Sequence, residues 1–148
     1  MLQISVTNRQ RAVKLDAARV KRHARRVLLE MGFVKAELSL AFVDDAQMRL
    51  LNAAYRRINA PTDVLAFAMT EGRFSEINPQ VLGDVVISAE TAAYRAKHDG
   101  RPLRDEVNAL LVHGILHLLG YDHERSPSDA RVMRAKERAL RRLIEAPE

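Results

Sequence analysis

The stretch that decides how this chain folds and acts is His113-Gly114-Ile115-Leu116-His117-Leu118-Leu119-Gly120-Tyr121-Asp122-His123. His113 and His117 are four residues apart, so on a helix they share one face about one turn apart. Gly120 suits a left-handed C-cap that turns the chain back, and His123 can then approach from outside the helix. Apolar residues make this helix apolar almost all round and predict that it is buried: Leu110, Leu111, Ile115, Leu116, Leu118 and Leu119.

This spacing predicts a metal site. Two histidines four residues apart can share a helix face by coincidence, but a third one just after a helix-ending glycine favours a common ion. Imidazole nitrogens bind zinc at roughly 2 Å, and three protein ligands leave the fourth tetrahedral position open, which is typical of catalytic zinc. We therefore expect one zinc ion per chain, held by His113, His117 and His123.

The same spacing, His-x3-His-x2-Gly-x2-His, occurs in the metzincin peptidases, which carry Glu directly after the first histidine as the general base. In this chain that position is Gly114, which cannot accept a proton. A zinc metallopeptidase is therefore the least favoured interpretation. Zinc could still activate water and polarise an oxygen, and an anionic phosphodiester with a better leaving group than an amide would need less help from a protein base.

The charge distribution also favours an anionic substrate. The chain has 24 Lys and Arg against 19 Asp and Glu, a net charge of +5. The excess falls in two blocks, of which the first is Arg9, Arg11, Lys14, Arg19, Lys21, Arg22, Arg25 and Arg26, and the second is Arg125, Arg131, Arg134, Lys136, Arg138, Arg141 and Arg142. Clustered cations attract phosphate backbones, and arginine suits bidentate phosphate contacts. A solvated helix face is the alternative for either block, but together with the metal site they favour RNA or DNA as partner.

Composition and length indicate one α+β domain over residues 1–148. The chain has no cysteine, which excludes disulfides and thiolate ligands. No apolar run approaches the roughly 20 residues of a membrane span, and the first residues lack the pattern of a secretory signal. We expect a single small mixed sheet of four strands with about five helices, including a zincin-like metal helix.

The expected elements follow from periodicity and caps. Alternating or β-branched runs predict strands at Leu2–Val6, Leu38–Phe42, Val64–Ala68 and Gly83–Ile87. Expected N-caps are Asp16, either Asp44 or Asp45, Ser88 and Ser126, while Pro102 falls near the first turn of the histidine helix. The helix after Asp44 should bury Met48, Leu51, Tyr55 and Ile58, and the last helix should bury Val132, Met133, Lys136, Leu140, Leu143 and Ile144. Residues 70–81 read as a loop.

Two further blocks accompany the histidines. One is Tyr55-Arg56-Arg57-Ile58-Asn59-Ala60-Pro61-Thr62-Asp63-Val64-Leu65-Ala66-Phe67, and the other is Leu82-Gly83-Asp84-Val85-Val86-Ile87-Ser88. With the histidine block, and in this order, they make the whole chain resemble the YbeY family of bacterial metal-dependent endoribonucleases. Ala66 replaces a serine, and Ala68 a proline, that are frequent in the family.

The resemblance implies a cytoplasmic, single-strand-specific endoribonuclease that acts in 16S rRNA 3′-end maturation and ribosome quality control. It implies metal ligation by His113, His117 and His123, and a functional role for Arg56, expected on the phosphate of the scissile bond. The alternative for Arg56 is an arginine at a helix end that pairs with a carboxylate. RNA, the ribosome and assembly proteins are the implied partners, and a zinc-braced ribosome-assembly binding module is the main rival function.

Several single residues are left with two interpretations. Asp63, Asp84 or Asp122 could hold the second ring nitrogen of a ligating histidine, or could be turn and cap residues. His23 and His98 lie outside the motif, and we expect both on the surface.

Overall fold

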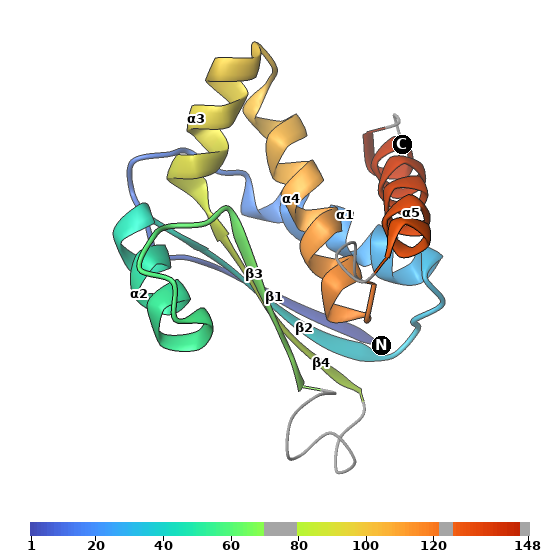
Figure 1. Cartoon of the computed structure of the whole chain (residues 1–148). Helices are drawn as coiled ribbons and strands as arrows, with labels where there is room; N and C mark the ends of the chain where they lie inside the picture. The colour runs from blue at the N-terminus through green and yellow to red at the C-terminus, as the bar shows by residue number, and fades with distance from the viewer. Residues whose placement is uncertain (70–79, 122–125, 146–148) are drawn as a thin grey trace.

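The computed structural model describes residues 1–69, 80–121 and 126–145 of the chain (Figure 1). The elements in chain order are β1 (Leu2–Asn8), α1 (Ala17–Glu30), β2 (Ala36–Val43), α2 (Asp45–Arg56), β3 (Val64–Ala68), β4 (Val81–Ser88), α3 (Ala89–Asp99), α4 (Leu103–Leu118) and α5 (Pro127–Glu145). The predicted α+β class with one four-stranded sheet is confirmed.

The sheet is mixed, as expected, with strand order β1-β2-β4-β3. Strand β1 runs parallel to β2 and β2 parallel to β4, while the edge strand β3 runs antiparallel to β4. The register of β4 shifts against β2 next to Gly83. Gly83 has φ +135°, and a Cβ there would collide with the Phe67 carbonyl oxygen, so this bulge requires glycine.

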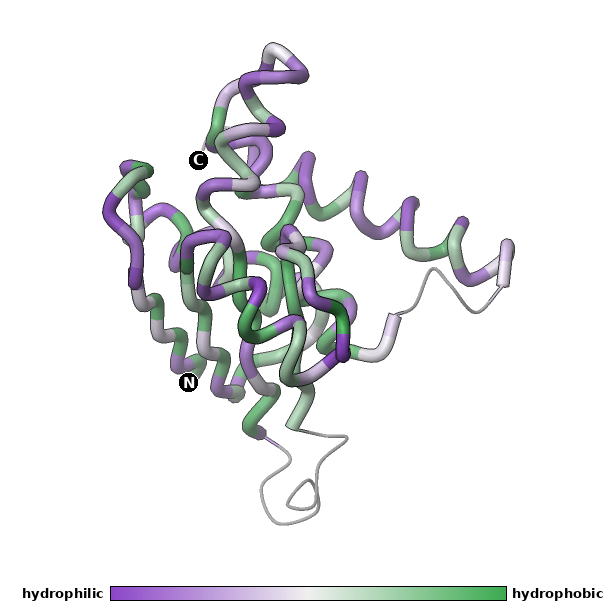
Figure 2. The backbone as a smooth tube through the Cα atoms, turned by 60° about the vertical axis from the view of Figure 1, so that its left-hand side comes forward, coloured by the Kyte–Doolittle hydropathy of each residue, from purple (hydrophilic) through white to green (hydrophobic). Residues whose placement is uncertain are grey.

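Helices cover the two sheet faces unequally. Strand residues alternate between faces, and the larger core forms where α1 and α4 pack on one of them, with α5 packed on these two helices. The opposite face buries a smaller cluster around Met48 of α2 and Val86 of β4. Figure 2 shows hydrophilic residues recurring along α5 with hydrophobic ones between them, as expected for a helix packed on one side only.

The predicted caps position the helices. In each case the side-chain oxygen of the cap accepts a hydrogen bond from the N–H three residues on, as the structure shows for Asp16, Asp44, Ser88 and Ser126. The hydrogen bond from the Arg19 N–H also lowers the pKa of the Asp16 carboxyl. The helix starts were therefore readable from short polar side chains.

Some expected buried positions are exposed. Tyr55 is 67 % exposed, Ile58 45 % and Val132 52 %. Helix α2 covers only a small part of its sheet face, so Met48 is buried while Tyr55 lies at the rim, with its ring against Phe67 at a centroid distance of 4.8 Å. Lys136, assigned to the inner stripe of the last helix, is exposed as well.

One element boundary differs from the prediction. Strand β4 begins at Val81, so the expected loop is shorter at its end, and most of that predicted loop, residues 70–79, lies outside the described residues. None of the helices in the described ranges is long and apolar enough to cross a membrane.

Candidate metal centre

Helix α4 carries the two histidines on one partly exposed flank. Ten of its sixteen residues are buried, among them Leu111, Ile115 and Leu116 in the core. His113 and His117 are half-buried, with ring centroids 4.8 Å apart and planes inclined by 63°. The predicted pairing of these two imidazoles on one helix face is confirmed.

Gly114 lies on the opposite flank, against the sheet. A Cβ at this position would be 2.6 Å from Val85 Cγ1 and 3.0 Å from Val64 Cγ2. Glycine therefore lets α4 approach strands β3 and β4 closely. A glutamate here would point into the sheet, so the position lacks room for a peptidase base as well as lacking the carboxylate.

The end of α4 has the predicted glycine turn. Gly120 has φ +98°, its N–H donates to the His117 carbonyl, and the Tyr121 N–H donates to the Leu116 carbonyl, a Schellman motif. The next residues, which include the expected ligand His123 and the candidate Asp122, lie outside the described residues. Within the described ranges no group of three His, Cys, Asp or Glu side chains could hold a metal. His113 and His117 fit two ligand positions, and the third ligand stays a prediction.

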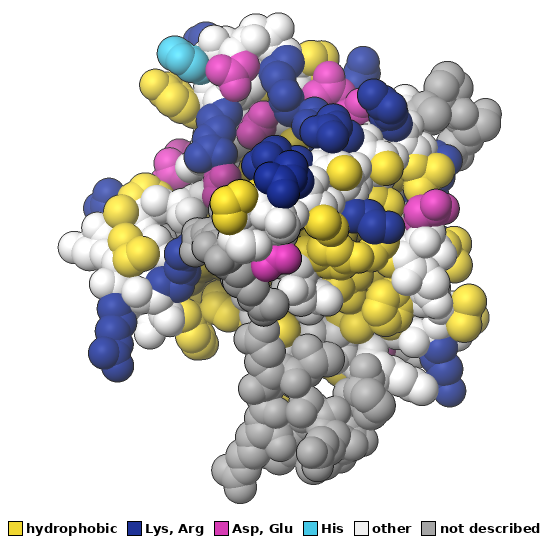
Figure 3. All heavy atoms as spheres, turned by 45° about the vertical axis from the view of Figure 1, so that its right-hand side comes forward, with side chains coloured by type: hydrophobic (Ala, Val, Ile, Leu, Met, Phe, Trp, Pro, Cys, Tyr) yellow, Lys and Arg dark blue, Asp and Glu magenta, His cyan; other side chains and the backbone are white. Residues whose placement is uncertain are grey.

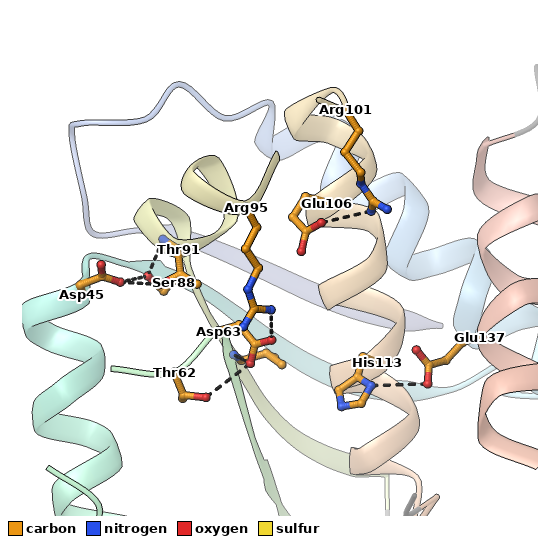
Figure 4. A network of polar contacts seen from close by, with 11 residues as sticks. Asp45, Thr62, Asp63, Ser88, Thr91, Arg95, Arg101, Glu106, His113 and Glu137 are labelled. Carbon is orange, nitrogen blue, oxygen red and sulfur yellow. Dashed lines mark hydrogen bonds and ion pairs between the residues drawn. The ribbon is translucent and has the colours of Figure 1, made fainter. Parts of the chain in front are cut away.

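A carboxylate that the sequence interpretation missed lies beside the first histidine. Glu137 of α5 places Oε1 3.5 Å from His113 Nδ1, and the two side chains are 24 % and 27 % exposed (Figure 4). The signal was present, because Glu137 falls four residues after the buried Met133, on the inward side of α5. The predicted inner stripe contains the neighbouring Lys136 in its place, and the structure shows Lys136 exposed and Glu137 partly buried.

Two of the three carboxylates proposed for this role, Asp63 and Asp84, interact elsewhere or face another side of the sheet. Asp63 accepts a hydrogen bond from the Val64 N–H at 2.8 Å and pairs with Arg95 (Figure 4). Asp84 is exposed on β4, and because its neighbour Val85 packs toward α4, Asp84 points to the opposite sheet face. Asp63 is therefore a partner of Arg95 at the start of β3, and the Asp84 hypothesis is wrong.

The two remaining described histidines differ. His23 Nδ1 lies 2.9 Å from Oδ1 of the buried Asn108, so this histidine links α1 to α4 and its assignment to the surface was wrong. His98 is exposed as predicted, with its ring stacked on Tyr94 at 6.1 Å.

Arg56 is the last residue of α2 and is exposed. It makes no hydrogen bond or ion pair with any residue in the described ranges. Among the described residues, Arg56 therefore does not pair with a carboxylate. It also forms no hydrogen bond there with His113 or His117.

Comparison with known proteins decides the family. The profile described as "Endoribonuclease YbeY" matches residues 5–145. A curated Endoribonuclease YbeY from Geobacter metallireducens is 42 % identical over 145 residues, covering 97 % of both chains. The chain belongs to the YbeY family. Another YbeY relative, from Syntrophus aciditrophicus, is 40 % identical over 94 % of this chain and 88 % of its own.

A comparison with solved structures concerns the fold. A solution structure from Thermotoga maritima matches with a TM-score of 0.63 and 21 % identity, covering 97 % of this chain and 89 % of that one. At this identity the likeness concerns the fold. Membership in the YbeY family makes the chain a metal-dependent endoribonuclease in rRNA processing, and RNA its substrate. The enzyme class expected from the resemblance is confirmed at that level.

Proposed function

We propose that this chain cuts single-stranded RNA with one zinc ion held by His113, His117 and His123. The observation that supports it is the placement of His113 and His117 together on one partly exposed flank of a helix that is mostly buried. Imidazole donors suit zinc, and a three-histidine set leaves a position for water or substrate. Bound zinc would supply a Lewis acid and lower the pKa of water.

Glu137 would orient the first ligand. A carboxylate next to His113 Nδ1 favours the tautomer that carries its proton on this nitrogen, which leaves Nε2 free to bind metal. The 3.5 Å separation is longer than an optimal N–H···O hydrogen bond, so a small rotation of either side chain is needed to form one. Glu137 is the carboxylate that the structure places next to the His113 ring.

Arg56 would contact the phosphate. Its guanidinium has no acidic partner among the described residues, so it is available to neutralise charge that grows on the phosphoryl oxygens. Gly114 supplies no proton acceptor, and either water or the neighbouring ribose 2′-OH could be the attacking group. Arg56 is assigned to binding and charge stabilisation, not to proton transfer.

The biological setting follows from the family and the charge. We infer that the substrate is rRNA, with 16S 3′-end maturation and ribosome quality control as the processes, and that the chain works in the cytoplasm with the ribosome and its assembly proteins. A net charge of +5 supports association with such a polyanion.

The test combines metal content with RNA cleavage in one preparation. His117→Ala should lose bound zinc and cleavage of an rRNA fragment, while Arg56→Ala should keep zinc and lose cleavage by about 100-fold or more. Arg49→Ala, at another exposed arginine of α2, is the matched control and should behave like the parent.

Two outcomes would contradict the proposal. Undiminished cleavage by both variants would exclude this site as the nuclease centre. Unfolding on chelation, with RNA binding but no turnover in the zinc-loaded protein, would instead support the zinc-braced binding module.

A further inference from the structure

We propose that Arg134, Arg138 and Arg141 form a phosphate-binding stripe on α5 that holds the RNA backbone beside the His113–Glu137 pair. This inference rests on the proposed function, because it names how the same substrate approaches the site. The three arginines fall at i, i+4 and i+7, so they lie along one side of the helix.

The neighbours of α5 show which side this is. Glu137 contacts His113 of α4, and Glu145 lines a hollow together with Arg104 and Asn108 of α4. The other flank of α5, with Lys136, Ala139 and Leu143, lines a hollow against the end of α1. By helical spacing the arginine stripe lies on the Glu137 and Glu145 flank, so it borders α4 on the side of the histidines.

The stripe is available to a ligand. Arg134 and Arg138 are exposed and form no ion pair within the described residues. Arg141 pairs with Glu145 at 3.7 Å, with both side chains about one-third exposed, which is a weak interaction in water. Figure 3, which brings the α5 side forward, shows Lys and Arg side chains gathered over the upper part of this face, with fewer acidic ones among them.

The chemistry favours nucleic acid over a protein partner. All three cations are guanidinium groups, which bind phosphate oxygens in a bidentate manner. The exposed apolar residue Val132 and the partly buried Leu143, which a protein interface would use as anchors, lie on the other flank of α5. Seven residues of helix span about 10 Å, enough for two or three phosphates of one strand.

Arg131, in the first turns of α5, is not part of the stripe. Arg131 donates to Ser128 Oγ at 3.2 Å, so its guanidinium is turned toward the first turn of α5. Lys21 and Arg25 of α1 line a different hollow, beside β1 and β2. Arg19 of the first block, in contrast, lines the same hollow as Glu145, so only part of that block lies on another surface.

The experiment compares two triple variants of the metal-loaded protein. The first is Arg134→Gln, Arg138→Gln and Arg141→Gln, and the control is Lys21→Gln, Arg25→Gln and Lys136→Gln, which removes the same charge elsewhere. Thermal melts select conditions in which both are folded. The readouts are kcat and KM for a fluorescent single-stranded RNA 16-mer, and its Kd across a KCl series.

The stripe variant should raise KM by about tenfold or more with little change in kcat, because the stripe binds the strand away from the reacting bond. Its slope of log K against log salt should fall by about two, as expected on losing three phosphate contacts to a single strand. The control variant should keep most of the parental slope.

If the parent cleaves the RNA and the two variants have equal KM values and equal salt slopes, the stripe does not bind RNA. An acidic protein surface would then be the ligand to test. A parent that binds zinc but does not cleave the 16-mer would contradict the proposed function instead. The two failures are therefore distinguishable.

Discussion

The two flanks of α4 place opposite demands on the same helix. One flank, with Gly114 and Ile115, packs against the sheet so closely that even one added carbon atom collides. The other, with His113 and His117, is half-buried, and His113 there faces Glu137 of α5. The contrast shows that the motif combines a fold requirement and a chemical requirement at adjacent residues.

The largest effect is expected from placing a carboxylate on the flank of α4 that packs against the sheet. Gly114→Glu restores the residue that metzincin peptidases carry, but here the carboxylate would be forced between Val64 and Val85. Overpacking together with burial of a charge should cost at least about 4 kcal/mol, a large part of the stability of a domain this size. Circular dichroism should therefore show an unfolded or strongly destabilised protein, with no casein cleavage.

The control for this variant is Ala135→Glu, which adds the same side chain at an exposed position of α5. It should shift the free energy of unfolding by no more than about 0.5 kcal/mol. A folded Gly114→Glu protein with zinc-dependent casein cleavage would refute the separation of the two flanks.

How much of this was readable from the sequence differs between the flanks. The pairing of His113 with His117 and the turn at Gly120 follow from helical spacing and backbone preference, which are local. The role of Gly114 depends on how closely two strands approach it, and the place of Glu137 depends on α5 packing across α4. Such contacts join residues far apart in the chain, so a single sequence could only suggest them.

The same limit explains the errors. Asp84 has the right chemistry to orient a histidine, but strand alternation sends it to the other face, and only the assignment of faces shows this. Tyr55 and Val132 have apolar spacing, yet both side chains are more than half exposed. Caps such as Asp16 were correct because their hydrogen bonds close within three residues.

A smaller effect is expected from removing one side chain on each flank. Ile115→Ala deletes a fully buried side chain and should lower the free energy of unfolding by about 2–5 kcal/mol. His117→Ala, measured without metal, should cost less than about 1.5 kcal/mol, since this side chain is only partly buried, unlike Ile115. Urea denaturation of both variants in chelator measures the difference.

Equal losses for these two variants would mean that His117 supports the fold as much as Ile115 does. Adding zinc sharpens the comparison, because ligand binding to the native state should stabilise Ile115→Ala and leave His117→Ala nearly unchanged.

The last expected effect concerns the affinity for metal and involves the carboxylate beside the histidine flank. Glu137→Gln keeps the size of the side chain but removes the charge that faces His113 Nδ1, and should weaken zinc binding about 10- to 100-fold. Competition with a chromophoric chelator measures the affinity independently of activity. Asp63→Asn is the matched control, because that carboxylate faces Arg95 and the Val64 N–H, so its zinc affinity should equal that of the parent. A loss of affinity in the control as large as in Glu137→Gln would mean that both carboxylates act on the site through the fold, and that Glu137 has no specific hold on the His113 ring.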